Sequence, residues 1–156
     1  MISTSINYRE TKELLEIFFL SNTKFEKVYI KEHPRMPVRP IIESSIKGFP
    51  SYELIGGSMQ DAFQLSDIVY VANSSSVLLE SVLLKKQTVS LISLSTLPIP
   101  AINKASNLYF VEDESSLSNI FAQLTNESKT DILKNDTVND LYLNKDLHLW
   151  HKFLKV

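Results

Sequence analysis

The chain has 156 residues, which fits one domain of ordinary size. Hydrophobic residues make up 44% of the chain and charged residues 22%, as in ordinary soluble globular proteins. A net charge of −2 excludes the basic footprint of a nucleic-acid-binding protein, so no nucleic-acid partner is expected. The absence of cysteine excludes disulfides, thiolate catalysis and Cys-based zinc sites.

The first half of the chain predicts short strands between helices. The spacing of Leu14 and Phe18 indicates an amphipathic helix, and Ser58 is the expected N-cap of a later one. Prolines within residues 34–40 predict an extended loop after the first strand. The expected elements are a helix over 8–21, a strand at about 27–31, a helical turn around 41–47, a strand over 52–55 and a helix over 59–65.

The second half continues the alternation. Residues 67–72 are the most apolar run, as expected for a strand covered on both faces. The further expected elements are a helix over 75–85, strands over 88–94 and 108–111, a helix over about 115–125 and a last helix over about 141–155. This order predicts an α/β fold with a Rossmann-like, three-layer parallel sheet and helices on both faces. A single domain spanning 1–156 is expected, with the last helix as a candidate packing arm.

Two polar clusters follow predicted strands directly. The first is Lys31-Glu32-His33-Pro34-Arg35, and the second is Asn73-Ser74-Ser75-Ser76, which leads into a helix. Loops at the carboxyl ends of strands form the ligand crevice of an open α/β sheet, and a helix N-terminus attracts anions. The clusters therefore predict a site for a phosphate-bearing ligand, a nucleotide. The alternatives are solvated charges at a strand end and plain N-capping by one serine, and neither common glycine-rich nucleotide motif is present.

Weaker candidates lie between and beyond the clusters. Gly57 and Ser58 either let the backbone approach a ligand or form a tight turn. Glu80 either accepts hydrogen bonds from ribose hydroxyls or faces solvent. No metal site is expected, because His148 and His151 have no suitably placed acidic neighbour.

Residues 28–35 and 66–80 together resemble the nucleotide-sugar-binding half of GT-B glycosyltransferases. The nearest likeness is to bacterial surface-polysaccharide enzymes such as sialyl-, polysialyl- and Kdo-transferases and the glycerophosphate polymerases. Those families carry a His-Pro motif after one strand and a serine-rich motif after another. The resemblance implies that His33 binds the donor phosphate as the catalytic residue and that Ser74 to Ser76 hold phosphate or the leaving nucleotide. The expected donor-binding residues are Lys31, His33, Pro34, Arg35, Gly57, Ser58, Asn73, Ser74, Ser75, Ser76 and Glu80.

The same resemblance implies an incomplete enzyme. A GT-B enzyme has two Rossmann-like domains, and this chain supplies one, so the glycan acceptor is expected on a missing N-terminal domain. The expected substrate is a nucleotide sugar, with a CMP-sugar favoured and no further cofactor. A homodimer or a partner domain held through the last helix is left open. The alternatives are a nucleotide-sugar epimerase-like domain and a non-catalytic interaction module on the same fold.

The sequence shows no signal peptide and no apolar stretch near the roughly 20 residues that a membrane span needs. A cytoplasmic protein is expected, with peripheral attachment at the inner membrane as the alternative.

Overall fold

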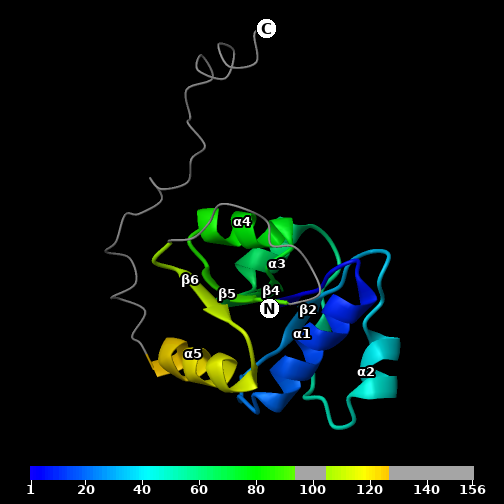
Figure 1. The fold of residues 1–156 in the computed structure, drawn as a ribbon. Helices are drawn as coiled ribbons and strands as arrows, with labels where there is room; N and C mark the ends of the chain where they lie inside the picture. The colour runs from blue at the N-terminus through cyan, green and yellow to red at the C-terminus, as the bar shows by residue number, and fades with distance from the viewer. Residues whose placement is uncertain (94–104, 127–156) are drawn as a thin grey trace, which may run out of the picture.

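A six-stranded parallel sheet forms the centre of the structure, a computed structural model that describes residues 1–93 and 105–126 (Figure 1). The strands are β1 (Ile2–Ser3), β2 (Tyr29–Lys31), β3 (Glu53–Leu54), β4 (Ile68–Ala72), β5 (Gln87–Leu91) and β6 (Leu108–Val111). The helices are α1 (Tyr8–Leu20), α2 (Arg39–Ser45), α3 (Met59–Gln64), α4 (Ser76–Leu83) and α5 (Glu114–Asn126). The predicted α/β fold with a parallel, Rossmann-like sheet is confirmed.

The elements expected in this part of the chain are all present, with ends shifted by a few residues. The extended loop expected over the prolines within 34–40 is wrong at its end, because Arg39 and Pro40 are helical. The helical turn expected around 41–47 is α2, which starts two residues earlier, with Pro40 in its first turn. A proline fits there because the missing N–H would have no partner within the helix. The last helix expected over about 141–155, and with it His148 and His151, lies outside the described residues.

The strand β1 is the one element that the sequence pattern does not predict. It has two residues, but it lies in the middle of the sheet and pairs with β2 on one side and β4 on the other. Ile2 is in register with Ile30 and Tyr70, and Ser3 with Lys31 and Val71. A strand this short shows no alternation, so its position comes from its two neighbours and not from its own sequence.

Helices cover both faces of the sheet, α3 and α4 on one and α1 and α5 on the other (Figure 1). The strand β4 shows why both faces need a cover, because successive side chains point to opposite faces. Its Tyr70 and Ala72 join the core under α1, α2 and α5, whereas Val69 and Val71 join the core under α3 and α4. Residues 67–72 therefore lack polar alternation because both faces of the strand are buried, as predicted.

The order in which strands are added to the sheet reverses between β1 and β4. Strands β2 and β3 extend the sheet on one side of β1, and β4, β5 and β6 extend it on the other. In open α/β sheets this reversal separates the loops at the carboxyl ends of the two middle strands and leaves a crevice between them. The carboxyl ends of β1, β2 and β4 are therefore the part of the fold where a ligand site is expected.

Candidate functional site

Three loops meet at the carboxyl edge of the sheet around β1. The β1–α1 loop begins at Thr4, the β2–α2 loop carries His33, and the β4–α4 loop runs over 73–75. Because β2 and β4 are the two strands hydrogen-bonded to β1, both polar clusters lie beside the β1–α1 segment. The sequence prediction placed each cluster after a strand, and the strand order places the two clusters on either side of the β1–α1 segment.

His33 is held on its backbone by β1 and on its ring by its own loop. Its backbone N–H donates to the Thr4 hydroxyl at 3.2 Å, and its Nδ1 accepts from the backbone N–H of Arg35 at 3.2 Å. A neutral imidazole whose Nδ1 accepts carries its hydrogen on Nε2. The half-buried ring therefore offers an N–H donor, the polarity that a phosphate oxygen requires.

The charged neighbours of His33 have different surroundings. The ammonium of Lys31 donates to the carbonyls of Gly57 at 2.6 Å and Gly56 at 3.1 Å, so it bridges β2 to the β3–α3 loop. The carboxylate of Glu32 accepts the backbone N–H of Val38 at 3.0 Å, just before α2. Pro34 and Arg35 are exposed at the tip of the loop. Of the cations in the cluster, the structure leaves Arg35 facing solvent and directs Lys31 to a neighbouring loop.

Gly57 and Ser58 form the turn that starts α3. Gly57 has a φ of +68°, a conformation that favours glycine, and an added Cβ would lie 3.2 Å from the Asp61 carboxylate. Ser58 caps the helix in a reciprocal capping box with Asp61. Hydrogen bonds from the Ser58 hydroxyl and backbone lower the pKa of Asp61, and the charge of Lys31 acts in the same direction. These contacts explain the presence of Gly57 and Ser58 by the turn and the cap of α3. The contact with a ligand that the sequence predicts for them stays a prediction.

The serine cluster forms the N-terminus of α4. Ser75 is the N-cap, and its hydroxyl accepts from the backbone N–H of Val77 at 3.3 Å, while Ser76 is exposed in the first turn. The Ser74 hydroxyl donates to the Glu10 carboxylate at 2.5 Å. Asn73 is buried, and its side-chain oxygen accepts no hydrogen bond from the described residues. Ser75 alone caps the helix, as the plain-capping alternative expects. Ser74 does not take part in the cap and has a separate partner on α1.

Two glutamates of α1 belong to this edge and were not predicted. Glu10 is 1% exposed and contacts Ser74, and Glu13 accepts from the Ser93 hydroxyl at 2.7 Å, just after β5. In the sequence Glu10 is an acidic residue in the first turn of a helix, which is ordinarily explained by the helix dipole. Only the pairing of β1 with β4 shows that this turn faces the serine cluster. Glu80, by contrast, is exposed on α4, and the ribose contact considered for it stays a prediction.

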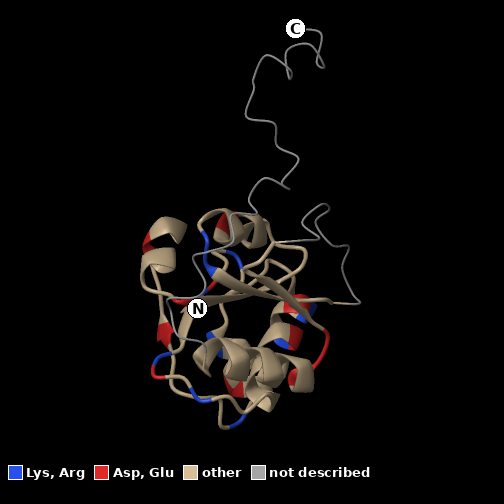
Figure 2. Cartoon of the chain, turned by 90° about the vertical axis from the view of Figure 1, so that its left-hand side faces the viewer, with Lys and Arg blue, Asp and Glu red and all other residues tan. Residues whose placement is uncertain are grey.

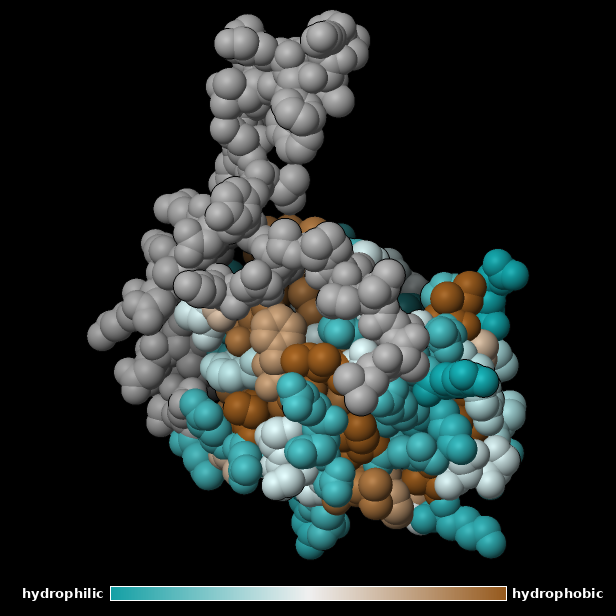
Figure 3. Space-filling model, in the orientation of Figure 1, coloured by the Kyte–Doolittle hydropathy of each residue, from teal (hydrophilic) through white to brown (hydrophobic). Residues whose placement is uncertain are grey.

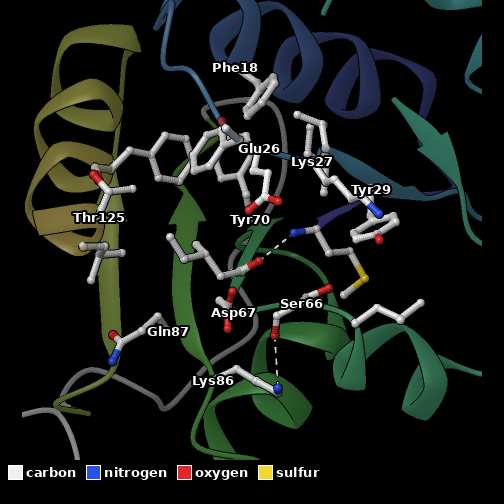
Figure 4. Close-up of a pocket in the computed structure, with 18 of the residues that line it drawn as sticks. Phe18, Glu26, Lys27, Tyr29, Ser66, Asp67, Tyr70, Lys86, Gln87 and Thr125 are labelled. Carbon is white, nitrogen blue, oxygen red and sulfur yellow. Dashed lines mark hydrogen bonds between the residues drawn. The ribbon is translucent and has the colours of Figure 1, made fainter. Parts of the chain in front are cut away.

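A cavity of about 930 Å³ lies at the opposite, amino edge of the sheet (Figure 4). It is lined by residues at the starts of four strands and by aromatic rings from the core, including Ile2, Tyr29, Ile68, Gln87, Phe18, Phe25 and Phe121. The ammonium of Lys86 lies at its rim and donates to the Ser66 carbonyl at 3.0 Å (Figure 4). Ligands of open α/β sheets bind at the carboxyl edge, so the size of this cavity does not make it the nucleotide site.

Basic and acidic residues are mixed in the view of Figure 2, where Lys and Arg positions are interspersed with Asp and Glu positions along the described chain. Hydrophobic and hydrophilic residues are likewise interspersed on the face seen in Figure 3. No group of three potential metal-ligating side chains occurs among residues 1–93 and 105–126. No helix in those ranges has the length and apolar composition needed to cross a bilayer.

The fold defines an open-sheet α/β protein with a Rossmann-like strand order. The chain matches no family model, no curated protein and no solved structure. A function for this chain therefore has to be argued from its own residues and their geometry.

Proposed function

We propose that the chain is the donor-nucleotide-binding domain of a glycosyltransferase of surface polysaccharide or lipopolysaccharide biosynthesis, with a CMP-sugar as the favoured donor. One observation carries the proposal: the His-Pro and serine clusters lie at the carboxyl ends of β2 and β4, the two strands that flank β1. Nucleotides bind open α/β sheets at this reversal of strand order. The proposal implies a cytoplasmic protein, with peripheral attachment at the inner membrane as the alternative.

The chemistry of sugar transfer suits the donors at this edge. An acceptor hydroxyl oxygen forms a bond to the anomeric carbon and gives its proton to a base, while the bond between that carbon and the phosphate oxygen breaks and negative charge accumulates on the departing nucleotide. The Nε2–H of His33 and the backbone N–H of Ser76, the first residue of α4, can donate to that phosphate, whereas the N–H of Val77 is already capped by Ser75. We assign the glycan acceptor to a separate N-terminal domain, so this domain holds the donor and the other completes the reaction.

Calorimetric titration with CMP, CDP, UDP and GDP tests the proposal. We expect CMP and CDP to bind, and His33→Ala to weaken CMP by about tenfold, since it removes a contact to a charged phosphate. Ser75→Ala should also weaken CMP, because it removes the hydroxyl that caps the first turn of α4. Ser44→Ala is the matched control, because Ser44 lies on α2 and its hydroxyl contacts the Ile41 carbonyl and Ser45. Failure of all four nucleotides to bind, or an unchanged CMP affinity in His33→Ala, would overturn the proposal. A clear preference for UDP would favour the epimerase-like alternative.

A further inference from the structure

The hydroxyl of Ser74 has a fixed polarity. A serine hydroxyl carries one hydrogen, and a carboxylate oxygen accepts hydrogen bonds but has none to donate. Because the Ser74 hydroxyl donates to Glu10, its hydrogen points to α1 and its two lone pairs are what a ligand would meet. A phosphate oxygen is also an acceptor, so Ser74 in this arrangement does not suit a phosphate.

A second serine at the same edge repeats this arrangement. The hydroxyl of Ser93 donates to Glu13, one helical turn after Glu10 on α1. The strands β4 and β5 are neighbours, so α1 directs a carboxylate to a serine beyond each of two adjacent strand ends. Two negative charges behind two hydroxyls also oppose the approach of a phosphate through the Coulomb interaction.

One acceptor in the loop, the side-chain oxygen of Asn73, has no donor among the described residues. The side-chain oxygen of Asn73, directly before Ser74, is buried and accepts no hydrogen bond from the described residues. Buried polar atoms without a partner are uncommon in folded proteins. This observation is independent of the Glu10 contact, and it places a second acceptor without a described donor directly beside Ser74.

We propose that Ser74, oriented by Glu10, accepts a hydrogen bond from a sugar hydroxyl of the ligand and does not bind its phosphate. The inference rests on the proposed function and divides the site in two. Phosphate lies toward the Nε2–H of His33 and the first turn of α4, and a sugar ring lies toward Ser74. Glu10 is buried and acts through Ser74, so it is a positioning residue. The hydroxyl belongs either to the ribose or to the transferred sugar.

Three affinity ratios measured by calorimetry on the whole chain separate these possibilities. The ribose ratio is the affinity for CMP divided by that for 2′,3′-dideoxy-CMP, and it reports the ribose hydroxyls. The sugar ratio is the affinity for CMP-sialic acid divided by that for CMP, and it reports the transferred sugar. The phosphate ratio is the affinity for CMP divided by that for cytidine, and it reports the phosphate. In Ser74→Ala we expect either the ribose ratio or the sugar ratio to fall by about three- to tenfold, as for the loss of one hydrogen bond. The phosphate ratio stays unchanged. The ratio that falls identifies the ring.

Glu10→Gln provides the second variant, because it keeps the volume of the buried side chain if Ser74→Ala proves unstable. The amide of Gln removes the negative charge and can donate to Ser74 as well as accept, which frees the serine hydrogen for a phosphate oxygen, so the phosphate ratio should rise. Ser44→Ala is again the control and should change none of the three ratios. A fall in the phosphate ratio in Ser74→Ala, or no fall in either hydroxyl ratio, would overturn this inference alone. If neither cytidine nor uridine nucleotides bind the unmodified chain, the proposed function is overturned and the inference with it.

Discussion

The hydroxyl of Thr4 accepts a hydrogen bond from the backbone N–H of His33 at 3.2 Å, and this contact joins the loops that follow β1 and β2. Thr4 is buried, whereas His33 is half-buried. The donor lies in a loop that leaves the sheet, and the acceptor lies directly after the central strand. The backbone position of His33 is therefore fixed by β1 as well as by its own loop, and β1 is the strand that the sequence pattern did not reveal.

Thr4→Val should remove that acceptor while keeping the shape of the side chain. We expect a loss of about 1 kcal/mol in the free energy of unfolding, because the N–H of His33 loses its partner. Nucleotide affinity should fall as well, because the imidazole is no longer held in one place. Urea denaturation and calorimetry measure the two effects. Thr125→Val on the exposed end of α5 is the control, and equal stability of the two variants would contradict the assigned role of Thr4.

Lys31→Met tests the bridge between β2 and the β3–α3 loop. The Lys31 ammonium donates to three carbonyls of that loop, those of Ile55, Gly56 and Gly57, so its removal should speed amide hydrogen exchange over residues 56–58. Stability should fall by about 1 kcal/mol. The control is Lys27→Met, on an exposed lysine just before β2. If hydrogen exchange in the loop is unchanged and nucleotide affinity falls strongly, the bridging role is contradicted and Lys31 binds the phosphate instead.

The sequence predicts the part of this site that depends on strong local patterns. The run over 67–72 and the serines after it identify a strand, a turn and a helix, so the position of Ser74 at a strand end follows directly. Its contact with Glu10 does not follow, since the two residues are 64 positions apart and meet only because β1 pairs with β4. The orientation of the Lys31 side chain cannot be predicted from the sequence either, because a strand of three residues is too short to establish an alternating pattern.

The capping box of α3 should give Asp61 an acid-shifted titration. Hydrogen bonds from the Ser58 hydroxyl at 2.7 Å and backbone N–H at 3.2 Å lower the pKa of Asp61. A lowered folded pKa contributes stability above the unfolded pKa of about 3.9, and that contribution is lost as the pH falls through the folded value. In Ser58→Ala we expect the pKa of Asp61 to rise toward its ordinary value, as measured by carbon-detected NMR titration.

Asp113 provides an internal control in the same spectra. Its pKa is lowered by hydrogen bonds from Ser116, at the start of α5, so Ser58→Ala should leave it unchanged. A parallel rise at both carboxyls would indicate a global change in the protein and not the loss of one cap.

Phe121 should be one of the most destabilising positions to truncate. It is buried on α5, and its ring makes edge contacts with Phe25 at 4.9 Å and Tyr70 at 5.9 Å between centroids. Phe121→Ala would remove the contact between α5 and the centre of the sheet, at a cost of about 3–5 kcal/mol. Phe110→Ala, on the 42% exposed Phe110 of edge strand β6, is the matched control and should cost far less. Denaturant unfolding of both variants decides this, and similar midpoints would mean that the packing of α5 contributes little to the stability of the fold.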